Sequence, residues 1–425
     1  AANGVIVLTT KRGSGSVQVN YNGSFGYDVP HQRNPWNHLS PIEQAELRWM
    51  AFENSGEDPR GEGGDPQYGN GPVPVLPDYI QPDGAMEGEV NLDDYFVIPN
   101  YNNPALLGSF NRIVRANHEG TDWFREIFSP APTMNHELSV SGGGEIGNYL
   151  FSVNHLDQEG ALMHTFRNRY GFRANSSFNL GENVRIGENL SYTVSESPTI
   201  ASLTEGSAIG MAYRSQTIIP VYDVMGNYAG TFGSNLGNSQ NPVANMERTR
   251  HNRSSNERLF GNAFLEADLS ETFLFRTSFG GEITSGTSRS FSYPTYERAE
   301  NSPNNSFTAS SYTGRNYTWS NTLQYSNTLA DVHNIELLLG AEMYRNWGSN
   351  VGGTTQDYFS FDPNFTNLNT GSGTQTNTNS YYEDALLSGF GRLDYSYDDR
   401  YILSVTLRRD GSSRFLNQQW GWFPA

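Results

Sequence analysis

The sequence predicts an all-β fold, a transmembrane antiparallel β-barrel. Segments of about ten residues alternate between apolar and polar side chains, as strands do when lipid covers one face and water the other. Short and long connectors alternate between these segments. No apolar run approaches the roughly 20 residues that a membrane helix needs, so strands would carry any membrane crossing. A soluble β-sandwich shows similar alternation, and this alternative stays open from the pattern alone.

The clearest pair of segments is residues 170–180 and 184–194. Apolar side chains such as Tyr170, Phe172 and Phe178 recur with a two-residue period in the first segment, and the second repeats the pattern. A short Gly-Glu-Asn sequence joins the two. The spacing predicts two strands connected by a tight turn.

Further pairs of this kind follow along the chain. They are residues 259–269 with 273–279, 319–329 with 335–343, and 393–397 with 401–407. Long polar stretches lie between or before the pairs, at about residues 28–135, 195–256, 285–316 and 347–384. Connectors of this length are uncommon in compact soluble domains. Tight turns at one end and long loops at the other are typical of outer-membrane barrels.

Composition excludes several functional classes. The formal net charge is −18, so phosphate would be repelled and a nucleic-acid partner is not expected. There are no cysteines, which excludes a disulfide scaffold and a thiol nucleophile. With 44 glycines and 20 prolines, the loops can turn sharply.

The start of the chain carries the first sign of a known family. Residues 3–13 contain a continuous apolar run that suits a strand buried on both faces, and residues 17–27 alternate like a first wall strand. This segment resembles the end of the plug domain in TonB-dependent outer-membrane transporters of the SusC/RagA class, which is found in Bacteroidota. The resemblance implies that residues 1–14 end a plug domain. It implies that residues 15–425 form the N-terminal half of the barrel.

Similar motifs follow in order and cover nearly the whole chain. They are DWFREIF at 122–128, LSVSGG at 138–143, DQEGAL at 157–162, IIPVYDVMGNYAG at 218–230, NPVANME at 241–247, LLLGAE at 337–342, and RLDYSYDDRYILSVTLRRDGSSRF at 392–415, followed by Phe423 and Pro424. No single motif would suffice. Their order and spacing make the resemblance specific.

The resemblance implies a plugged barrel of about 22 strands, of which this sequence predicts roughly eleven. Half a barrel cannot close, and open sheet edges do not survive in lipid. We therefore expect the chain to be a fragment that lacks the TonB box, most of the plug and the second half of the barrel.

The function implied is TonB-dependent import of oligosaccharides or oligopeptides across the outer membrane. A SusD-like surface lipoprotein would cover the outer face, and TonB would act through the missing N-terminal region. One alternative is a TonB-dependent receptor for a siderophore or vitamin. Another is a surface β-protein that binds carbohydrate without transporting it, although this alternative leaves the apolar run at residues 5–8 unexplained.

The first long loop carries the one helix that the sequence predicts strongly. Ser40 and Glu43 form a capping box, and Gly56 marks the end of the helix. Its apolar stripe consists of Ile42, Ala45, Trp49 and Phe52. The stripe could pack on its own loop or contact a partner lid.

Motifs that suggest catalysis or cofactor binding lack their required context. Gly142, Gly144 and Gly147 match the spacing of a dinucleotide fingerprint, but a strand pattern follows them where that fingerprint requires a helix. The adjacent carboxylates Asp398 and Asp399 are better interpreted as turn formers. The histidines show no metal-ligand spacing. We therefore predict no catalytic residues, no metal site, no cofactor and no enzyme.

Binding is the remaining role, and aromatic side chains in the long loops are its candidates. Aromatic faces beside amides and carboxylates can stack on sugar rings or accept peptide side chains. The candidate substrate-binding residues are Tyr95, Phe96, Tyr101, Tyr222, Tyr228, Phe359, Phe361 and Phe365. Aromatic residues near strand ends, such as Tyr170, are instead expected to form the girdle at the membrane interface.

Overall fold

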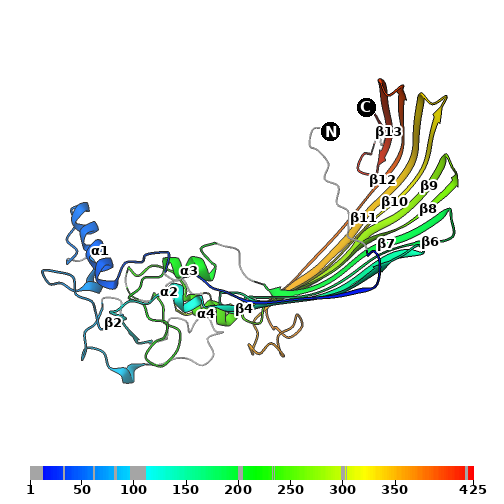
Figure 1. Ribbon diagram of the computed structural model, residues 1–425. Coiled ribbons are helices and arrows are strands. Elements are labelled where there is room, and N and C mark those ends of the chain that lie inside the picture. The colour runs from blue at the N-terminus through cyan, green and yellow to red at the C-terminus, as the bar shows by residue number, and fades with distance from the viewer. Residues whose placement is uncertain are drawn as a thin grey trace.

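A computed structural model describes residues 13–31, 34–60, 63–80, 84–95, 112–199, 204–231, 233, 235–297, 302, 304–416 and 420–425. Twelve strands form one sheet in the order β1-β4-β5-β6-β7-β8-β9-β10-β11-β12-β13-β14. Every neighbouring pair is antiparallel, which confirms the predicted fold class. Figure 1 shows the sheet as a single curved wall. The expected plug strand in residues 3–13 lies almost entirely outside the described residues.

The strands of the wall pair in the order in which they occur along the chain. They are β1 (Gln18–Asp28), β4 (Ala131–Gly143), β5 (Gly147–Glu159), β6 (Phe166–Asn179), β7 (Val184–Pro198), β8 (Arg253–Ser270), β9 (Phe273–Ser292), β10 (Ser306–Leu329), β11 (His333–Gln356), β12 (Gln375–Tyr397), β13 (Tyr401–Ser412) and β14 (Trp420–Pro424). The remaining elements are α1 (Pro41–Ser55), α2 (Trp123–Ile127), α3 (Ala208–Arg214), α4 (Pro242–Thr249), the 3-10 turns η1 (Pro66–Tyr68) and η2 (Leu92–Asp94), and the small hairpin of β2 (Tyr79–Ile80) and β3 (Val114–Arg115).

Tight turns close one end of the wall. Ala330 and Asp331, and likewise Asp398 and Asp399, have positive φ values between 48° and 60°. Each pair lies in a three-residue loop, residues 330–332 and 398–400. Positive φ angles suit the twist of a β-hairpin, and aspartate tolerates them better than most residues. The interpretation of Asp398 and Asp399 as turn formers is confirmed. The glycine-rich segment that matched the dinucleotide spacing is also a hairpin turn, in which Gly144 and Gly147 exchange backbone hydrogen bonds.

Strands β8 to β12 contain 18 to 24 residues, about twice the length that crosses a bilayer. They therefore continue through much of residues 285–316 and 347–384, which we expected to be loops. The true connectors are residues 293–305 and 357–374. Beyond the lipid both faces of a strand meet water, so apolar alternation disappears although the backbone ladder continues.

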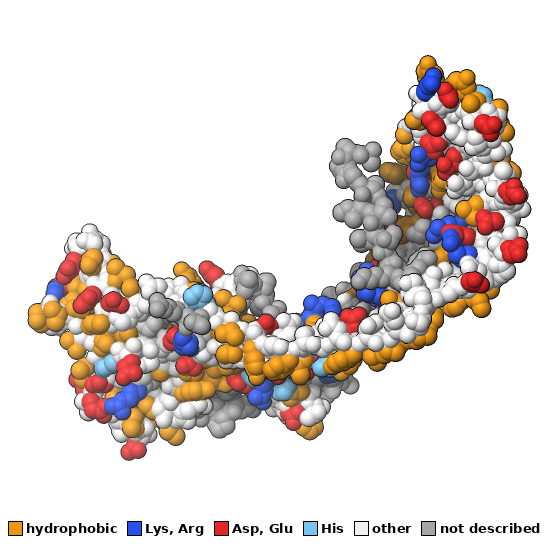
Figure 2. Space-filling model, viewed as in Figure 1, with side chains coloured by type: hydrophobic (Ala, Val, Ile, Leu, Met, Phe, Trp, Pro, Cys, Tyr) orange, Lys and Arg blue, Asp and Glu red, His pale blue; other side chains and the backbone are white. Residues whose placement is uncertain are grey.

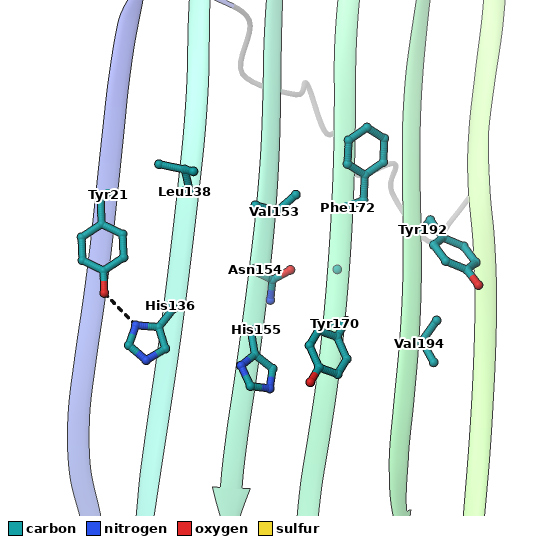
Figure 3. A pocket seen from close by; sticks show the side chains of 11 residues that line it. Tyr21, His136, Leu138, Val153, Asn154, His155, Tyr170, Phe172, Tyr192 and Val194 are labelled. Atoms are coloured by element: carbon teal, nitrogen blue, oxygen red, sulfur yellow. Dashed lines mark hydrogen bonds between the residues drawn. The ribbon is translucent and has the colours of Figure 1, made fainter.

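The register of the wall aligns the apolar side chains of neighbouring strands on one face. Tyr21, Leu138, Val153, Phe172 and Tyr192 occupy successive partner positions on five strands. Figure 3 shows these side chains along a shallow groove of about 390 Å³. Phe172 keeps 40% of its surface exposed. Hydrophobic side chains run along the lower edge of the sheet in Figure 2. This uncovered apolar face is what contact with lipid requires.

The other face of the wall is polar and carries ion pairs between neighbouring strands. Arg258 on β8 donates to both carboxylate oxygens of Glu282 on β9, at 2.8 and 3.2 Å. Closer to the tight turns, Glu266 accepts from Arg276 at 2.8 Å and also contacts Arg185. Side chains of this kind suit a water-filled lumen.

The four helices gather at the end of the wall opposite the tight turns (Figure 1). Together with β2, β3 and their connectors they form a folded unit, which we call the loop lobe, residues 34–130 and 199–252. Its core joins residues far apart in sequence. The buried members are Ala45, Trp49, Tyr68, Ile80, Val114, Trp123, Ile127, Ala212, Ile218, Ile219, Ala229, Leu236 and Val243. Among the described residues, no helix is both long and apolar enough to cross a bilayer.

Helix α1 has the ends that the sequence predicts. Ser40 and Glu43 form a complete capping box, and Gly56 ends the helix with a φ of 80°. The buried positions are Pro41, Ala45 and Trp49. The apolar stripe packs on the core of its own loop lobe. Ile42 stays 40% exposed and does not belong to the buried stripe.

We expect the change Ser40→Ala to destabilise the first turn of α1 by about 1 kcal/mol, because the cap hydrogen bond is lost. Hydrogen bonds from the Ser40 side chain and backbone lower the pKa of Glu43 below its ordinary value of 4.5. A lowered folded-state pKa stabilises the fold above that value, and this contribution is lost as the pH falls through the folded pKa. Hydrogen exchange of residues 41–55 across that pH range measures both effects. Equal exchange in Ser40→Ala and the parent protein would contradict the capping argument.

Candidate functional site

The motif at residues 218–230 supplies both a core segment and a surface hairpin of the loop lobe. Ile218 and Ile219 are buried in the core. The chain then reverses at Gly226, whose φ of 81° suits glycine. Tyr222 and Tyr228 face each other across the hairpin as a bridge pair. Their rings stack with centroids 5.6 Å apart.

Asp223 organises this hairpin from inside. Its side chain is fully buried, and its Oδ1 accepts backbone hydrogen bonds from Met225 at 3.0 Å and Asn227 at 2.8 Å. Its Oδ2 accepts from the Tyr95 hydroxyl at 2.8 Å and from Arg112 at 3.4 Å. A buried carboxylate needs such partners to offset the cost of losing water. Asp223 therefore connects the hairpin to two segments more than 100 residues away.

A second buried ion pair extends the network. Arg248 on α4 donates to the two carboxylate oxygens of Glu297 at 2.6 and 3.2 Å, and the Glu297 side chain is fully buried. The guanidinium carbons of Arg112 and Arg248 lie 3.5 and 5.1 Å from the ring centroid of Tyr296. Two arginines over one ring, each paired to a buried acid, hold the loop lobe against the connector between β9 and β10.

The surroundings of Tyr95 and Tyr228 determine the protonation state of these two tyrosines. Burial and the hydrogen bond to Asp223 raise the pKa of Tyr95 to about 12. Its hydroxyl also accepts from Asn227 at 2.6 Å. The hydroxyl of Tyr95 is thus occupied within the protein, which leaves its ring as the part able to contact a ligand. Burial, followed by the nearby charge of Glu247, raises the pKa of Tyr228. Both phenols are therefore protonated at neutral pH.

The predicted aromatic residues fall into two groups. Tyr95, Tyr222 and Tyr228 come together around the 222–228 hairpin, and Tyr222 is 52% exposed. The other group lies on the connector between β11 and β12, where Phe359 and Phe365 are exposed. Phe361 of the same connector packs against Phe291 and Tyr293. Phe96 and Tyr101 lie outside the described residues.

Sequence reasoning missed the charged residues that support the aromatic ones. These are Arg112, Asp223, Arg248 and Glu297. Asp223 directly follows Tyr222 in a Tyr-Asp-x-x-Gly-Asn turn sequence, and that turn chemistry is a signal that could have identified it. The other three have no local signal. In the described part of the chain, no group of three or more His, Cys, Asp or Glu side chains is placed to hold a metal ion.

Comparison with known proteins supports the fold and the family. No protein-family model matches the chain. TonB-dependent receptor P26 of Formosa agariphila is 28% identical over 313 residues, which is 71% of this chain and 30% of that protein. TonB-dependent receptor SusC of Bacteroides thetaiotaomicron is 26% identical over an alignment that covers 100% of this chain and 38% of SusC. The chain is therefore similar to SusC-like TonB-dependent receptors.

Solved structures show the same architecture. A structure of the RagAB peptide transporter matches with a TM-score of 0.73 and 20% identity, and covers 100% of this chain and 46% of that chain. The RagAB peptide importer in its closed-closed state gives a TM-score of 0.71 at 21% identity. The chain spans about a third of the length of the curated relatives it matches, between 30% and 38% for P26 and SusC.

Proposed function

We propose that this chain forms part of the wall and outward loops of a TonB-dependent importer in the outer membrane of a Gram-negative bacterium of the Bacteroidota type. One observation carries the proposal. A single-layer wall of twelve strands has an uncovered apolar face, a polar face with ion pairs, tight turns at one end and a folded lobe at the other. Lipid against the apolar face and water against the polar face explain this combination.

The cargo of the proposed importer is an oligosaccharide or an oligopeptide. The sequence relative named SusC and the structural relative named as a peptide importer support these two classes. Residues 1–14 would end the plug domain and residues 15–425 would form wall and loops. A SusD-like lipoprotein would cover the loop lobe, and TonB would act on the plug. Substrate binding on one side and pulling on the other would then shift the plug between two states.

The exposed ring of Tyr222 is the strongest candidate for contact with cargo. It stacks on Tyr228, so the hairpin offers a rigid aromatic surface at little cost in side-chain entropy. Tyr95 and the exposed Phe359 and Phe365 are further candidates. Phe96 and Tyr101 remain predictions from the sequence alone.

We expect Tyr222→Ala to reduce uptake of the cargo about tenfold, since one stacking contact contributes roughly 1–2 kcal/mol. The matched control is Tyr213→Ala, which removes a tyrosine of the same lobe that is 59% exposed. Uptake of labelled cargo by whole cells is the measurement. Equal uptake by both variants and the parent would remove Tyr222 from the binding surface.

Growth experiments test the function itself. A strain that lacks the gene should fail on one class of polymer, either glycans or peptides, as the only nutrient source, and should regain growth when the gene is restored. Normal growth on all polymers, with a defect only under iron limitation, would instead support a siderophore receptor. A product that stays monomeric and soluble without detergent would reject the transporter and support the carbohydrate-binding alternative.

A further inference from the structure

Two arginines face each other across the outer part of the wall. Arg253 on β8 and Arg289 on β9 are register partners. Like charges directly opposite each other in an antiparallel pair destabilise it. Arg253 is offset by contacts away from Arg289: its Nη1 donates to the backbone oxygens of Arg250 and Asn252, and its guanidinium lies 4.7 Å from the ring centroid of Phe166. An anion beside the pair would offset the charge of Arg289.

A cavity of about 370 Å³ lies at this pair, and we call it the Arg253–Arg289 pocket. Arg248 and His251 also line it, and its one carboxylate is Glu196. Arg248 is already neutralised by Glu297. Glu196 lies 3.5 Å from Arg253. Within the described residues, no carboxylate lies within 4.0 Å of Arg289, whose guanidinium instead lies 5.5 Å from the ring centroid of Phe307.

The pKa of His251 is consistent with an excess of positive charge around the pocket. The pKa of His251 is lowered, first by burial and then by the charges of Arg250 and Arg253. The imidazole is thus neutral at pH 7 and adds no further repulsion. A positive pocket in a chain with a net charge of −18 is a local exception that calls for an anionic partner.

The pocket opens on the lipid side of the wall. Side chains alternate along a strand, so Arg289 shares a face with Ile283, and Arg253 shares a face with Leu259. The pairing of β8 with β9 shifts register only at residues 268–270, so the alternation of faces is unbroken between the apolar residues and the arginines. Arg253 stands three outward positions beyond Leu259, and Arg289 three beyond Ile283. That is roughly 20 Å along the strand, or ~14 Å of height for a strand tilted by about 45°. Farther out on β9, Phe291 is buried against the connector between β11 and β12.

We propose that the Arg253–Arg289 pocket binds a phosphate group on the sugar headgroup of a glycolipid in the surrounding outer leaflet. This rests on the outer-membrane location in the proposed function. A phosphate can accept paired hydrogen bonds from the guanidinium group of Arg289, and the nearby positive charge of Arg253 adds to the attraction. The pocket lies farther from the middle of the membrane than the acyl chains do, at a level that the sugars of a large lipid headgroup reach. Cargo in the lumen would meet the opposite face of these strands, so a membrane lipid is the fitting source.

Binding of defined lipids to the purified full-length transporter in detergent tests the proposal. The probes are phosphorylated lipid A and the same lipid without phosphate, and native mass spectrometry measures how much of each is bound. The parent protein should prefer the phosphorylated form about tenfold or more, and Arg253→Gln with Arg289→Gln together should remove that preference. The matched control is Arg258→Gln, on the same strand but facing the lumen and paired with Glu282 at 2.8 Å. It should keep the preference.

Several results would overturn the inference. Equal binding of the two lipids by the parent protein would do so, as would an unchanged preference in the double variant. A soluble phosphorylated sugar that binds as tightly as the lipid would assign the pocket to cargo instead. In lipid-free detergent the single variant Arg289→Gln should melt no lower than the parent, because Arg289 has no carboxylate partner among the described residues, and a lower melting temperature would show a purely structural role. Cargo uptake measured in parallel separates this inference from the proposed function, since the double variant should still import cargo.

Discussion

Replacing Asp223 by alanine should unfold the hairpin of the loop lobe and abolish cargo uptake. The change removes the carboxylate that accepts hydrogen bonds from Arg112, the Tyr95 hydroxyl and two backbone N–H groups. Removing one partner of a buried ion pair costs about 3–5 kcal/mol. This is a large fraction of the stability of a small folded unit.

Limited proteolysis of whole cells, together with uptake of labelled cargo, measures both consequences. Asp223→Ala should expose new cleavage sites in residues 84–130 and 204–231. The control is Asp93→Ala, because Asp93 is an exposed aspartate two residues from Tyr95 and its loss should leave cleavage and uptake unchanged. Resistance of Asp223→Ala to protease would show that the core of the lobe holds the hairpin without the carboxylate.

Replacing Leu339 by arginine should strongly reduce the amount of folded protein in the membrane. Leu339 lies on the apolar face near the middle of the band on β11 and is 51% exposed. An arginine facing lipid at the middle of a bilayer costs about 2–4 kcal/mol. Folded barrels resist detergent without heating, so the heat-dependent shift in gel migration gives the folded fraction.

The adjacent residue provides the matched control for this prediction. Leu338 lies on the polar face of the same strand, because neighbouring residues of a strand point to opposite faces. Leu338→Arg should therefore fold nearly as well as the parent protein. If both variants misfold equally, the two faces do not differ in their surroundings, and the assignment of lipid and lumen would be wrong.

The candidate site shows the limits of reading residues one at a time. The sequence suggested Tyr95, Tyr222 and Tyr228 because aromatic rings beside amides are common in binding loops. It offered no sign that the three gather around one hairpin, or that the Tyr95 hydroxyl is held by Asp223 and Asn227. Contacts that join residues more than 100 positions apart depend on how the whole lobe folds.

The sequence by itself determined the features that depend on neighbouring residues. Helix α1 with its capping box, the turn at Asp398 and Asp399, and the apolar face across residues 170–194 all follow from local periodicity and backbone preference. Only the tertiary structure decided where the strands end beyond the membrane, how Asp223 gathers its partners, and that Arg253 faces Arg289. Register, burial and charge pairing between distant segments leave no periodic trace in the chain, because each partner satisfies the other in space and not along the sequence.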